Sequence, residues 1–198
     1  MIIGLTGGSG VGKSCASEVF EAEGFLIIDF DKISRDVTSA GSECLAELTQ
    51  FFGDRILNAD QSLNRRLLGE IVFSDKEKLS ALNRITHKHI LKKSDEITNA
   101  NKDKNIIFDA PLLFEAGLEK KCDYVVSVLA DIQNRIERIC KRDSISEDIA
   151  RNRIRSQHDD DYYINKSDFC VYNNSNIENL EIQIKNIIRS IFDESGSN

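Results

Sequence analysis

The stretch Gly7-Gly8-Ser9-Gly10-Val11-Gly12-Lys13-Ser14 decides the fold of this chain. It fits a phosphate-binding pattern in which a glycine and four further residues precede Gly-Lys and a hydroxyl residue. The apolar run from Ile2 to Thr6 comes just before it and is long enough for a buried parallel strand. After it, apolar residues recur at helical spacing from Cys15 to Phe20. The stretch therefore lies between a strand and a helix, as this pattern requires.

The glycines of this stretch suit it to a ligand that is rich in oxygen atoms. A backbone without Cβ atoms reaches positive φ angles and comes close to such a ligand. Its N–H groups and the start of the following helix then form a nest for anions. Lys13 can reach β- and γ-phosphates, and the Ser14 hydroxyl can ligate Mg²⁺. The loop predicts binding of a nucleoside triphosphate; a glycine-rich turn that merely caps a helix is the alternative.

The composition limits the kind of protein. A chain of 198 residues, with 40% hydrophobic and 30% charged residues, is expected to form one compact domain with excursions. The net charge of −7 speaks against general nucleic-acid or membrane binding, and no membrane-spanning run or secretory signal is visible. Five cysteines are scattered and never form a CxxC pair. This favours reduced thiols in the cytoplasm over a disulfide frame or a structural zinc.

Two aspartates follow a second apolar run, Leu26–Ile28. Ligands gather at the carboxyl ends of parallel strands, so a carboxylate just past such an end points into the site. We expect Asp31 to take a proton from an attacking hydroxyl or to orient Mg²⁺. A helix N-cap is the alternative for Asp29 and Asp31, and each role could involve one of the two carboxylates.

Three further apolar runs complete the predicted sheet. Ile106–Phe108 precedes Asp109, the pattern expected of a carboxylate near Mg²⁺. Tyr124–Leu129 has the composition of a buried strand. Phe169–Tyr172 is a short last strand, and Asn173 lies at its end, where a nucleotide base could be recognised.

Residues 32–101 have a helical pattern with three apolar faces and no run that resembles a core strand. These faces consist of Cys44, Leu45, Leu48, Phe51 and Phe52; of Leu63, Leu67, Leu68, Ile71 and Val72; and of Leu79, Leu82, Ile85 and Ile90. The segment is therefore predicted to be a helical insertion between strands. Residues 180–191 predict a closing amphipathic helix, and residues 193–198 a disordered tail.

Seven basic residues fall within 21 positions, namely Arg135, Arg138, Lys141, Arg142, Arg151, Arg153 and Arg155. A solvated helix face is one explanation of such a run. A partly functional role is the alternative, because a polyphosphate must be neutralised somewhere. The helix is expected to turn Ile132, Ile136 and Ile139 inward and its arginines to the other face. Residues 143–160 are charged and lack a strong apolar face, so we expect a mobile cover over the site.

Two classes of triphosphate-binding protein compete, a kinase for a small acceptor and a GTPase-like switch. Asn165-Lys166-Ser167-Asp168 resembles the guanine-reading motif, but it precedes a strand where that motif should follow one. Asp109-Ala110-Pro111-Leu112 also lacks the glycine of the GTPase pattern. A kinase explains more, because a helical insertion can close over an acceptor and an arginine-rich cover can close over ATP. Such closure excludes water from the reaction.

The chain resembles the dephospho-CoA kinase family over nearly its whole length. The segments that carry the resemblance are residues 4–14, Asp29-Phe30-Asp31 with Arg35, residues 63–68, residues 83–90 around His87, residues 111–115, Gln133 with Arg138 and Arg142, Gln157, and Asn173-Asn174. Their order and spacing together make the resemblance specific.

The patterns and the resemblance together predict an α/β fold. It is a three-layer P-loop NTPase fold with a five-stranded parallel sheet, a helical acceptor-binding insertion and an arginine-rich lid. Residues 1–31, 102–141 and 161–198 would form the nucleotide-binding core. Residues 32–101 would bind the acceptor, dephospho-CoA, and residues 142–160 would form the lid.

The resemblance implies Mg²⁺-assisted transfer of the ATP γ-phosphoryl group to the ribose 3′-hydroxyl of dephospho-CoA, the last step of coenzyme A synthesis. The implied catalytic residues are Asp31, Lys13 and Arg142. The nucleotide would contact Gly8, Gly10, Val11, Gly12, Lys13, Ser14, Cys15 and Asn173. The acceptor would contact Asp31, Arg35, Arg65, His87, Pro111, Leu112 and Glu115. The metal would be held by Ser14 directly and by Asp109 through water. A kinase of another nucleotide or nucleoside is the alternative.

The sequence departs from the family pattern at a few positions. Cys15 stands where threonine is usual, and Lys88 replaces the proline that usually follows His87. Proline is favoured in the first turn of a helix, so its replacement weakens the expectation that a helix starts there. The resemblance otherwise implies a cytoplasmic enzyme with a small-molecule acceptor and without nucleic-acid or membrane partners. It would be a monomer or a weak homo-oligomer.

Overall fold

The computed structural model describes residues 1–195 of the chain. Helix α9 runs Ile177–Ser195, so the expectation of a disordered tail from residue 193 was wrong for its first residues. The rest of that tail, residues 196–198, lies outside the described part. Among the described helices, none combines the length and apolar character that crossing a bilayer demands.

The chain divides into two compact units. The first contains Met1–Ile27 and the chain from Asp103 onward, and the second contains Ile28–Lys102. We refer to them as the α/β unit and the helical unit. The finer division into a core, an acceptor domain of residues 32–101 and a lid of residues 142–160 stays a prediction.

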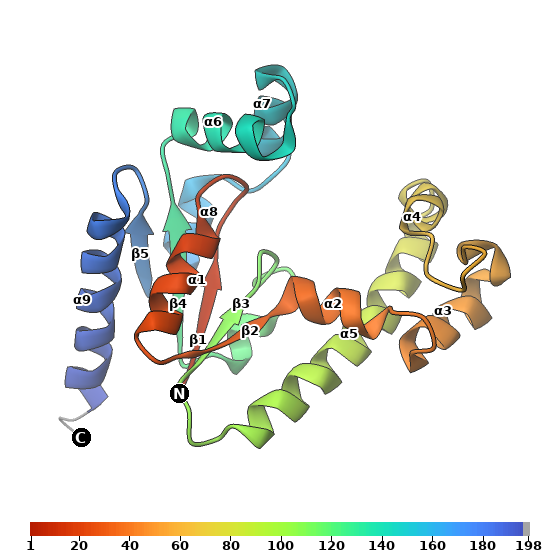
Figure 1. Ribbon diagram of the computed structural model, residues 1–198, viewed down its shortest axis with the longest axis horizontal. Coiled ribbons are helices and arrows are strands. Elements are labelled where there is room, and N and C mark those ends of the chain that lie inside the picture. The colour runs from red at the N-terminus through yellow and green to blue at the C-terminus, as the bar shows by residue number, and fades with distance from the viewer. Residues whose placement is uncertain (196–198) are drawn as a thin grey trace. The chain divides into compact units, whose positions relative to one another are not determined.

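The described residues form a sheet of five strands in the order β2-β3-β1-β4-β5 (Figure 1). The strands are β1 (Ile2–Thr6), β2 (Leu26–Asp29), β3 (Ile106–Asp109), β4 (Tyr124–Leu129) and β5 (Phe169–Tyr172). Strand β1 pairs in parallel with β3 and β4, and β4 pairs in parallel with β5. Helices cover both faces of such a sheet, so its strands are nearly continuous apolar runs. The predicted α/β fold with a five-stranded parallel sheet is confirmed.

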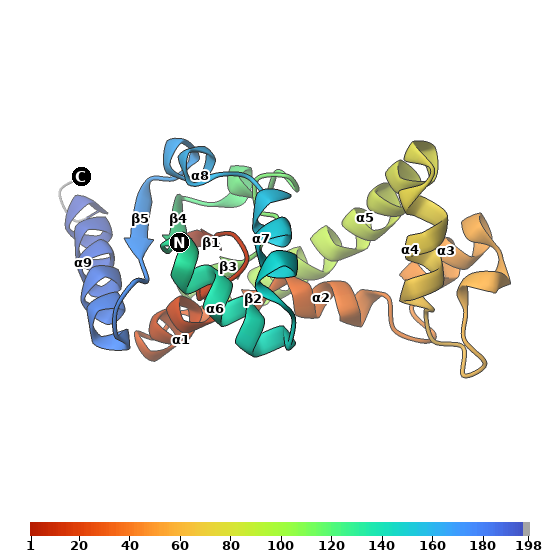
Figure 2. The same ribbon diagram turned by 90° about the horizontal axis from the view of Figure 1, so that it is seen from above.

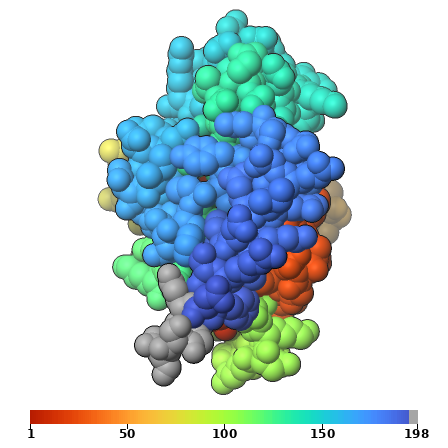
Figure 3. All heavy atoms as spheres, turned by 90° about the vertical axis from the view of Figure 1, so that its left-hand side faces the viewer, coloured from red at the N-terminus to blue at the C-terminus, as the bar shows by residue number. Residues whose placement is uncertain are grey.

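Helices lie on both sides of this sheet. Helix α1 (Lys13–Ala22) and α9 share one apolar core with the strands, to which Phe20 and Leu180 contribute. Helix α8 (Asp160–Lys166) packs against β4, and Figure 2 shows it across the sheet from α1. Figure 3 looks onto the outer surface of α9, drawn in dark blue. The sheet and the helices on its two faces therefore form the three layers of the fold.

Helices α6 (Ile132–Asp143) and α7 (Glu147–Arg155) pack on each other. Their shared apolar cluster consists of Ile136, Ile139, Ala150 and Ile154. Residues 143–160, expected to lack a strong apolar face, thus contribute a small one to this cluster. Ala150 is fully buried and Ile154 is 8% exposed. Two apolar side chains of α7 are enough to form this cluster because α6 supplies the other two.

The helical unit contains α2 (Phe30–Val37), α3 (Glu43–Phe52), the short helix η1 (Asp54–Ile56), α4 (Arg65–Phe73) and α5 (Lys76–Ala100). The expected helical pattern is thus observed, with one isolated bridge between Leu57 and Leu63. Its core includes Cys44, Leu48, Phe52, Leu68, Val72 and Ile85. Phe51, predicted to lie on an apolar face, is 52% exposed instead. Helix α3 turns its neighbour Phe52 inward, and the two rings meet edge to face.

Lys88 does not lie at a helix start, contrary to the expectation. Helix α5 begins at Lys76, where the Asp75 carboxylate caps the first turn. Lys88 is therefore in the helix interior, and its ammonium group donates to Glu47 at 3.0 Å. Lysine continues the helix because, unlike proline, it keeps the backbone N–H that the ladder requires.

Candidate active site

The phosphate loop, residues 7–12, connects β1 to α1. The φ angles of Gly7, Gly10 and Gly12 are 150°, 80° and 85°. A Cβ atom at Gly7 would come within 2.5 Å of the Val128 carbonyl oxygen, so only glycine fits there. Gly12 is the N-cap residue of α1 and has no side chain with which to cap it. The helix start therefore offers its N–H groups to an anion.

Lys13 and Asp109 form an ion pair between the start of α1 and the end of β3. Their side chains are only 17% and 11% exposed. The two residues meet because β1 and β3 are neighbours, with Leu5 and Asp109 in register, so both loops leave the same edge of the sheet. The hydroxyl residue Ser14 is exposed in the first turn of α1. A hydroxyl and a carboxylate oxygen are ligands that Mg²⁺ prefers, so this donor set fits that ion.

Arg138 and Asn173 hold the second half of the phosphate loop. The Arg138 guanidinium donates to the carbonyl oxygens of Gly10 at 3.3 Å, Val11 at 3.1 Å and Asn173 at 2.8 Å. The Asn173 side-chain amide, which is buried, donates to the Val11 carbonyl at 2.9 Å. Asn173 was expected near the base, and the observed contact of its side chain is with the phosphate loop. Arg138 was not among the predicted site residues, although its place three residues after Arg135 on one helix is a signal for it.

The remaining residues expected to contact the nucleotide lie on the loop or in the first turn of α1. These are Gly8, Gly10, Val11, Gly12, Lys13, Ser14 and Cys15, of which Cys15 is half-buried. The structure therefore brings the predicted phosphate-binding set together.

Arg142, the predicted phosphate clamp, contacts an acidic neighbour. Its guanidinium donates to the two carboxylate oxygens of Asp143 at 2.7 and 3.0 Å, and its side chain is 61% exposed. Arg153 from α7 also pairs with Asp143. The hydrogen bonds from Arg142 and then Arg153 hold the pKa of Asp143 well below its ordinary value. Asp143 in turn raises the pKa of Arg142, so the pair stays fully ionised at neutral pH.

The loop after β3 contains the predicted acceptor contacts of the α/β unit. Thr6 donates its hydroxyl to the Pro111 carbonyl at 3.4 Å, which ties this loop to the end of β1. Leu112 is 63% exposed and so free to meet a ligand. The Oε1 atom of Glu115 lies 3.3 Å from the Nε2 atom of His158, which follows α7. His158 was not predicted, and its lone position in a charged segment carries no signal of this pairing.

In the helical unit, Asp29 and not Asp31 is the N-cap residue of α2. The Asp29 carboxylate accepts from the Lys32 N–H at 2.9 Å and caps α2. Asp31 is exposed in the first turn, and Arg35 is exposed four residues later on the same helix. They therefore lie on one face of α2.

The other two predicted acceptor residues of this unit lie on α4 and α5. Arg65 donates to the Thr38 hydroxyl, at the end of α2, at 2.7 Å. The Nε2 atom of His87 is buried and has no hydrogen-bond partner among the described residues. An unpaired buried nitrogen of this kind favours a polar ligand over a purely structural histidine.

The residues that resemble a guanine-reading motif are used inside the sheet instead. The Asp168 carboxylate accepts from the Val125 N–H at 2.7 Å, and the hydroxyls of Ser167 and Ser127 are 2.6 Å apart. Both contacts join the start of β5 to β4. The side chains of Asp168 and Ser167 thus have structural roles, which argues against their use in reading a guanine base.

Comparison with known proteins points to one family. The family model described as dephospho-CoA kinase matches residues 1–179. A relative called dephospho-CoA kinase from Fusobacterium nucleatum subsp. nucleatum is 40% identical over 96% of this chain and 98% of its own length. One from Corynebacterium glutamicum is also 40% identical, over 96% of each chain.

Solved structures agree with the sequence relatives. A dephospho-CoA kinase from Campylobacter jejuni is similar with a TM-score of 0.71 and 26% identity over 98% of each chain. A Thermus thermophilus crystal structure gives a TM-score of 0.83 and 27% identity, over 96% of this chain and 97% of that one.

Proposed function

Since the chain belongs to the dephospho-CoA kinase family, as its motifs predicted, we propose that it transfers the γ-phosphoryl group of ATP to the ribose 3′-hydroxyl of dephospho-CoA. The observation that carries this proposal is the family match over residues 1–179, on a chain whose Lys13 and Asp109 meet beside an intact phosphate loop. The products would be coenzyme A and ADP.

The α/β unit supplies the nucleotide site in this proposal. The loop N–H groups and Lys13 would neutralise the ATP phosphates, and Asn173 would lie near the base. Because Arg138 and Asn173 already hold the Gly10 and Val11 carbonyls, the loop is shaped before the nucleotide arrives. Such preorganisation favours phosphoryl transfer, in which electrostatic stabilisation is the main contribution.

Ser14 and Asp109 would hold the Mg²⁺, the serine directly and the aspartate through water. When bound, the ion neutralises the negative charge on the phosphate oxygens. Lys13 would then exchange part of its contact with Asp109 for a phosphate oxygen.

The acceptor would be bound by Asp31, Arg35, Arg65 and His87 of the helical unit together with Pro111, Leu112 and Glu115. The exposed Asp31 carboxylate would take the proton of the 3′-hydroxyl as its oxygen bonds to the γ-phosphorus. The bond from that phosphorus to the β–γ bridging oxygen breaks in line, and ADP leaves with the electron pair. The cationic side chains Arg35 and Arg65 suit a pyrophosphate-bearing acceptor.

Arg142 would act from the lid. Its guanidinium is exposed and already bound to one anion, Asp143, so it can exchange that carboxylate for a phosphate oxygen. Closure of residues 142–160 would also exclude water, which otherwise accepts the phosphoryl group. We further infer a cytoplasmic enzyme that is a monomer or a weak homo-oligomer and binds no nucleic acid or membrane.

An acceptor panel tests the proposal. Purified protein with ATP and Mg²⁺ is given dephospho-CoA, AMP, dTMP or adenosine, and ADP release is followed, with the Lys13→Ala variant as the control. We expect dephospho-CoA alone to accelerate release, and the phosphorus of the product to couple to the ribose 3′ proton in NMR. Acceleration by another acceptor, or slow GTP hydrolysis without any acceptor, would overturn it.

A further inference from the structure

Both ends of the α6–α7 pair are bonded to one residue of the phosphate loop, Ser9. We infer that Gln157 and Arg135 are positioning residues that set the loop for ATP through Ser9. They differ from Lys13 and Arg142, for which direct phosphate contacts are proposed. The inference deepens the proposed function, and it concerns the binding of ATP and not the choice of acceptor.

Gln157 forms two complementary hydrogen bonds with Ser9. Its Oε1 atom accepts from the Ser9 backbone N–H at 2.8 Å, and its Nε2 atom donates to the Ser9 hydroxyl at 3.1 Å. A primary amide is the side chain that can accept and donate at one end in this way, whereas an ionised carboxylate only accepts. The backbone of Gln157 donates to the Ile154 carbonyl at 3.1 Å, which fixes it to the end of α7.

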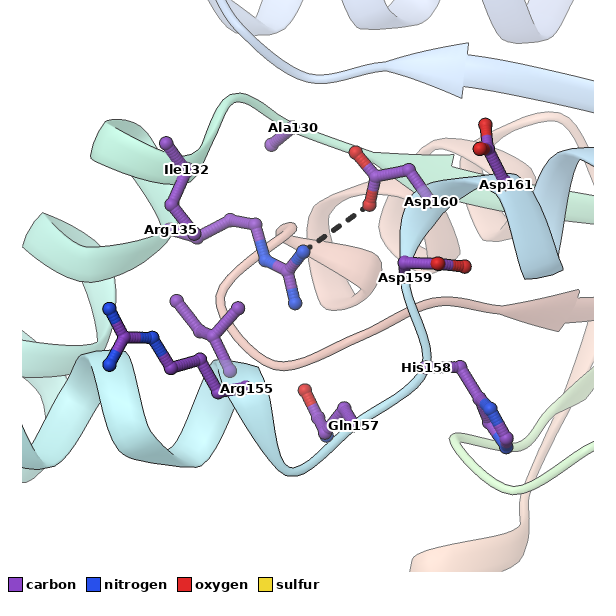
Figure 4. A pocket seen from close by; sticks show the side chains of 10 residues that line it. Ala130, Ile132, Arg135, Arg155, Gln157, His158, Asp159, Asp160 and Asp161 are labelled. Atoms are coloured by element: carbon purple, nitrogen blue, oxygen red, sulfur yellow. Dashed lines mark hydrogen bonds and ion pairs between the residues drawn. The ribbon is translucent and has the colours of Figure 1, made fainter.

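Arg135 holds Ser9 from α6. The residue is 4% exposed, its Nε atom donates to the Ser9 carbonyl at 3.0 Å, and Nη1 donates to Asp160 at 3.3 Å. Figure 4 shows the guanidinium pointing into a pocket of about 430 Å³ between α6, the end of α7 and the start of α8. Burial lowers the pKa of this arginine, and the Asp160 carboxylate counters that effect. A buried cation is retained here with an ion-pair partner, as its desolvation requires.

Ser9 therefore has its N–H, its carbonyl and its hydroxyl bonded to these two side chains. Its N–H faces Gln157, which leaves the phosphate contacts to other residues of the loop. Gly8 is closely packed by the same pair. A Cβ atom there would lie 2.5 Å from Arg135 Nη2 and 3.3 Å from Gln157 Oε1. The backbone of the loop is thus held by Arg135, which precedes the lid segment, and by Gln157, which lies within it.

The placement of Gln157 links the lid to the loop. A lid movement that shifts residue 157 would pull on the Ser9 N–H and hydroxyl, while Arg135 keeps the Ser9 carbonyl against α6. Phosphate binding, which depends on the loop backbone, would follow the position of the lid. We expect this coupling to appear in the affinity for ATP and not in the affinity for the acceptor.

ATP binding by calorimetry tests the inference without any acceptor. We expect Gln157→Leu to weaken ATP binding at least tenfold, with an unchanged KM for dephospho-CoA. Ser9→Ala, which removes only the hydroxyl partner, should weaken it by a smaller factor. In the Ser9→Ala background, Gln157→Leu should then have a smaller effect than in the wild type. The matched control is Asn152→Leu, which likewise replaces a side-chain amide with leucine, but at an exposed position of α7.

Two results would overturn the inference. One is a folded Gln157→Leu protein that binds ATP as the wild type does. The other is a double variant whose loss of ATP affinity equals the product of the losses caused by Ser9→Ala and Gln157→Leu alone. A merely structural role would lower the melting temperature and leave the ATP affinity of the folded protein intact. Because ATP binding is measured directly, failure of dephospho-CoA as acceptor would refute the proposed function and leave this test unaffected.

Discussion

Arg142 and Asp143 are neighbours in the chain and share two hydrogen bonds, so the arginine proposed to clamp phosphates already has a carboxylate partner. This partner keeps a long, exposed side chain in one place before the nucleotide binds. An arginine that is ordered in advance loses less rotamer entropy when it exchanges one anion for another.

Arg142→Ala should reduce kcat by about 10²- to 10³-fold, the range for loss of one group that stabilises charge in the transition state. The melting temperature should stay nearly unchanged, because the side chain is 61% exposed. Steady-state kinetics and thermal unfolding measure both quantities. Lys141→Ala, at the exposed preceding position, is the matched control. Wild-type turnover in Arg142→Ala would remove the residue from the mechanism.

Asp143→Asn should change how stability depends on pH. The pKa of Asp143 is lowered in the folded protein, so its contribution to stability is present above the unfolded value of about 3.9 and is lost as pH falls through the folded value. The difference in unfolding free energy between wild type and variant should therefore shrink from pH 5 downward. Urea titrations at several pH values measure it. A difference that grows as pH falls would contradict the assignment.

Lys13→Ala should abolish turnover, because it removes the cation that would neutralise the γ-phosphate. The substitution also leaves Asp109, 8% exposed, without this ion-pair partner. Lys13→Met, which keeps the apolar volume, should be equally inactive while folding normally by circular dichroism. Retained phosphoryl transfer in either variant would show that another group neutralises the phosphate.

Asp31→Asn should lower kcat by about 10²- to 10⁴-fold, the usual contribution of a general base, and leave ATP binding nearly intact. Single-turnover kinetics and calorimetry separate the two quantities. Asp36→Asn makes the same chemical change at another exposed position of α2 and should have no such effect. Equal turnover in the two variants would exclude Asp31 as the base.

Two thiols, the buried Cys44 and the half-buried Cys122, should resist alkylation. Burial raises the pKa of Cys44 to about 11 and of Cys122 to about 12. Their thiolate fraction at pH 8 is thus at least about 100-fold below that of an ordinary thiol with a pKa of about 8.5. Labelling with iodoacetamide, resolved by peptide mass spectrometry, should reach the half-buried Cys15 before either of these two thiols. Labelling of Cys122 ahead of Cys15 would contradict this.

Local patterns were enough to predict the sheet and the loop. The strands Tyr124–Leu129 and Phe169–Tyr172 have the predicted bounds, since fully buried strands are short apolar runs with clear ends. Lys13 was predicted to reach the phosphates and Asp109 to lie near Mg²⁺, each from its own local motif.

The supports of the loop could not be predicted in the same way. Arg135 was expected on the helix face opposite Ile132, Ile136 and Ile139, yet it is buried and Ile132 is 53% exposed. The helix is rotated so that Arg135 shares the inward face with Ile136 and Ile139, a position that the 3.6-residue period also allows. Gln157 contacts a residue 148 positions earlier, and no local pattern reports a contact of that separation.

The carbonyl oxygens of Ser9, Gly10 and Val11 all accept from the guanidinium groups of Arg135 and Arg138 on one helix. One charge is buried and the other is half-buried, so dissolved salt screens them far less than it screens cations on an open surface. The loop should therefore keep its shape, and much of its attraction for anions, across a wide range of ionic strength.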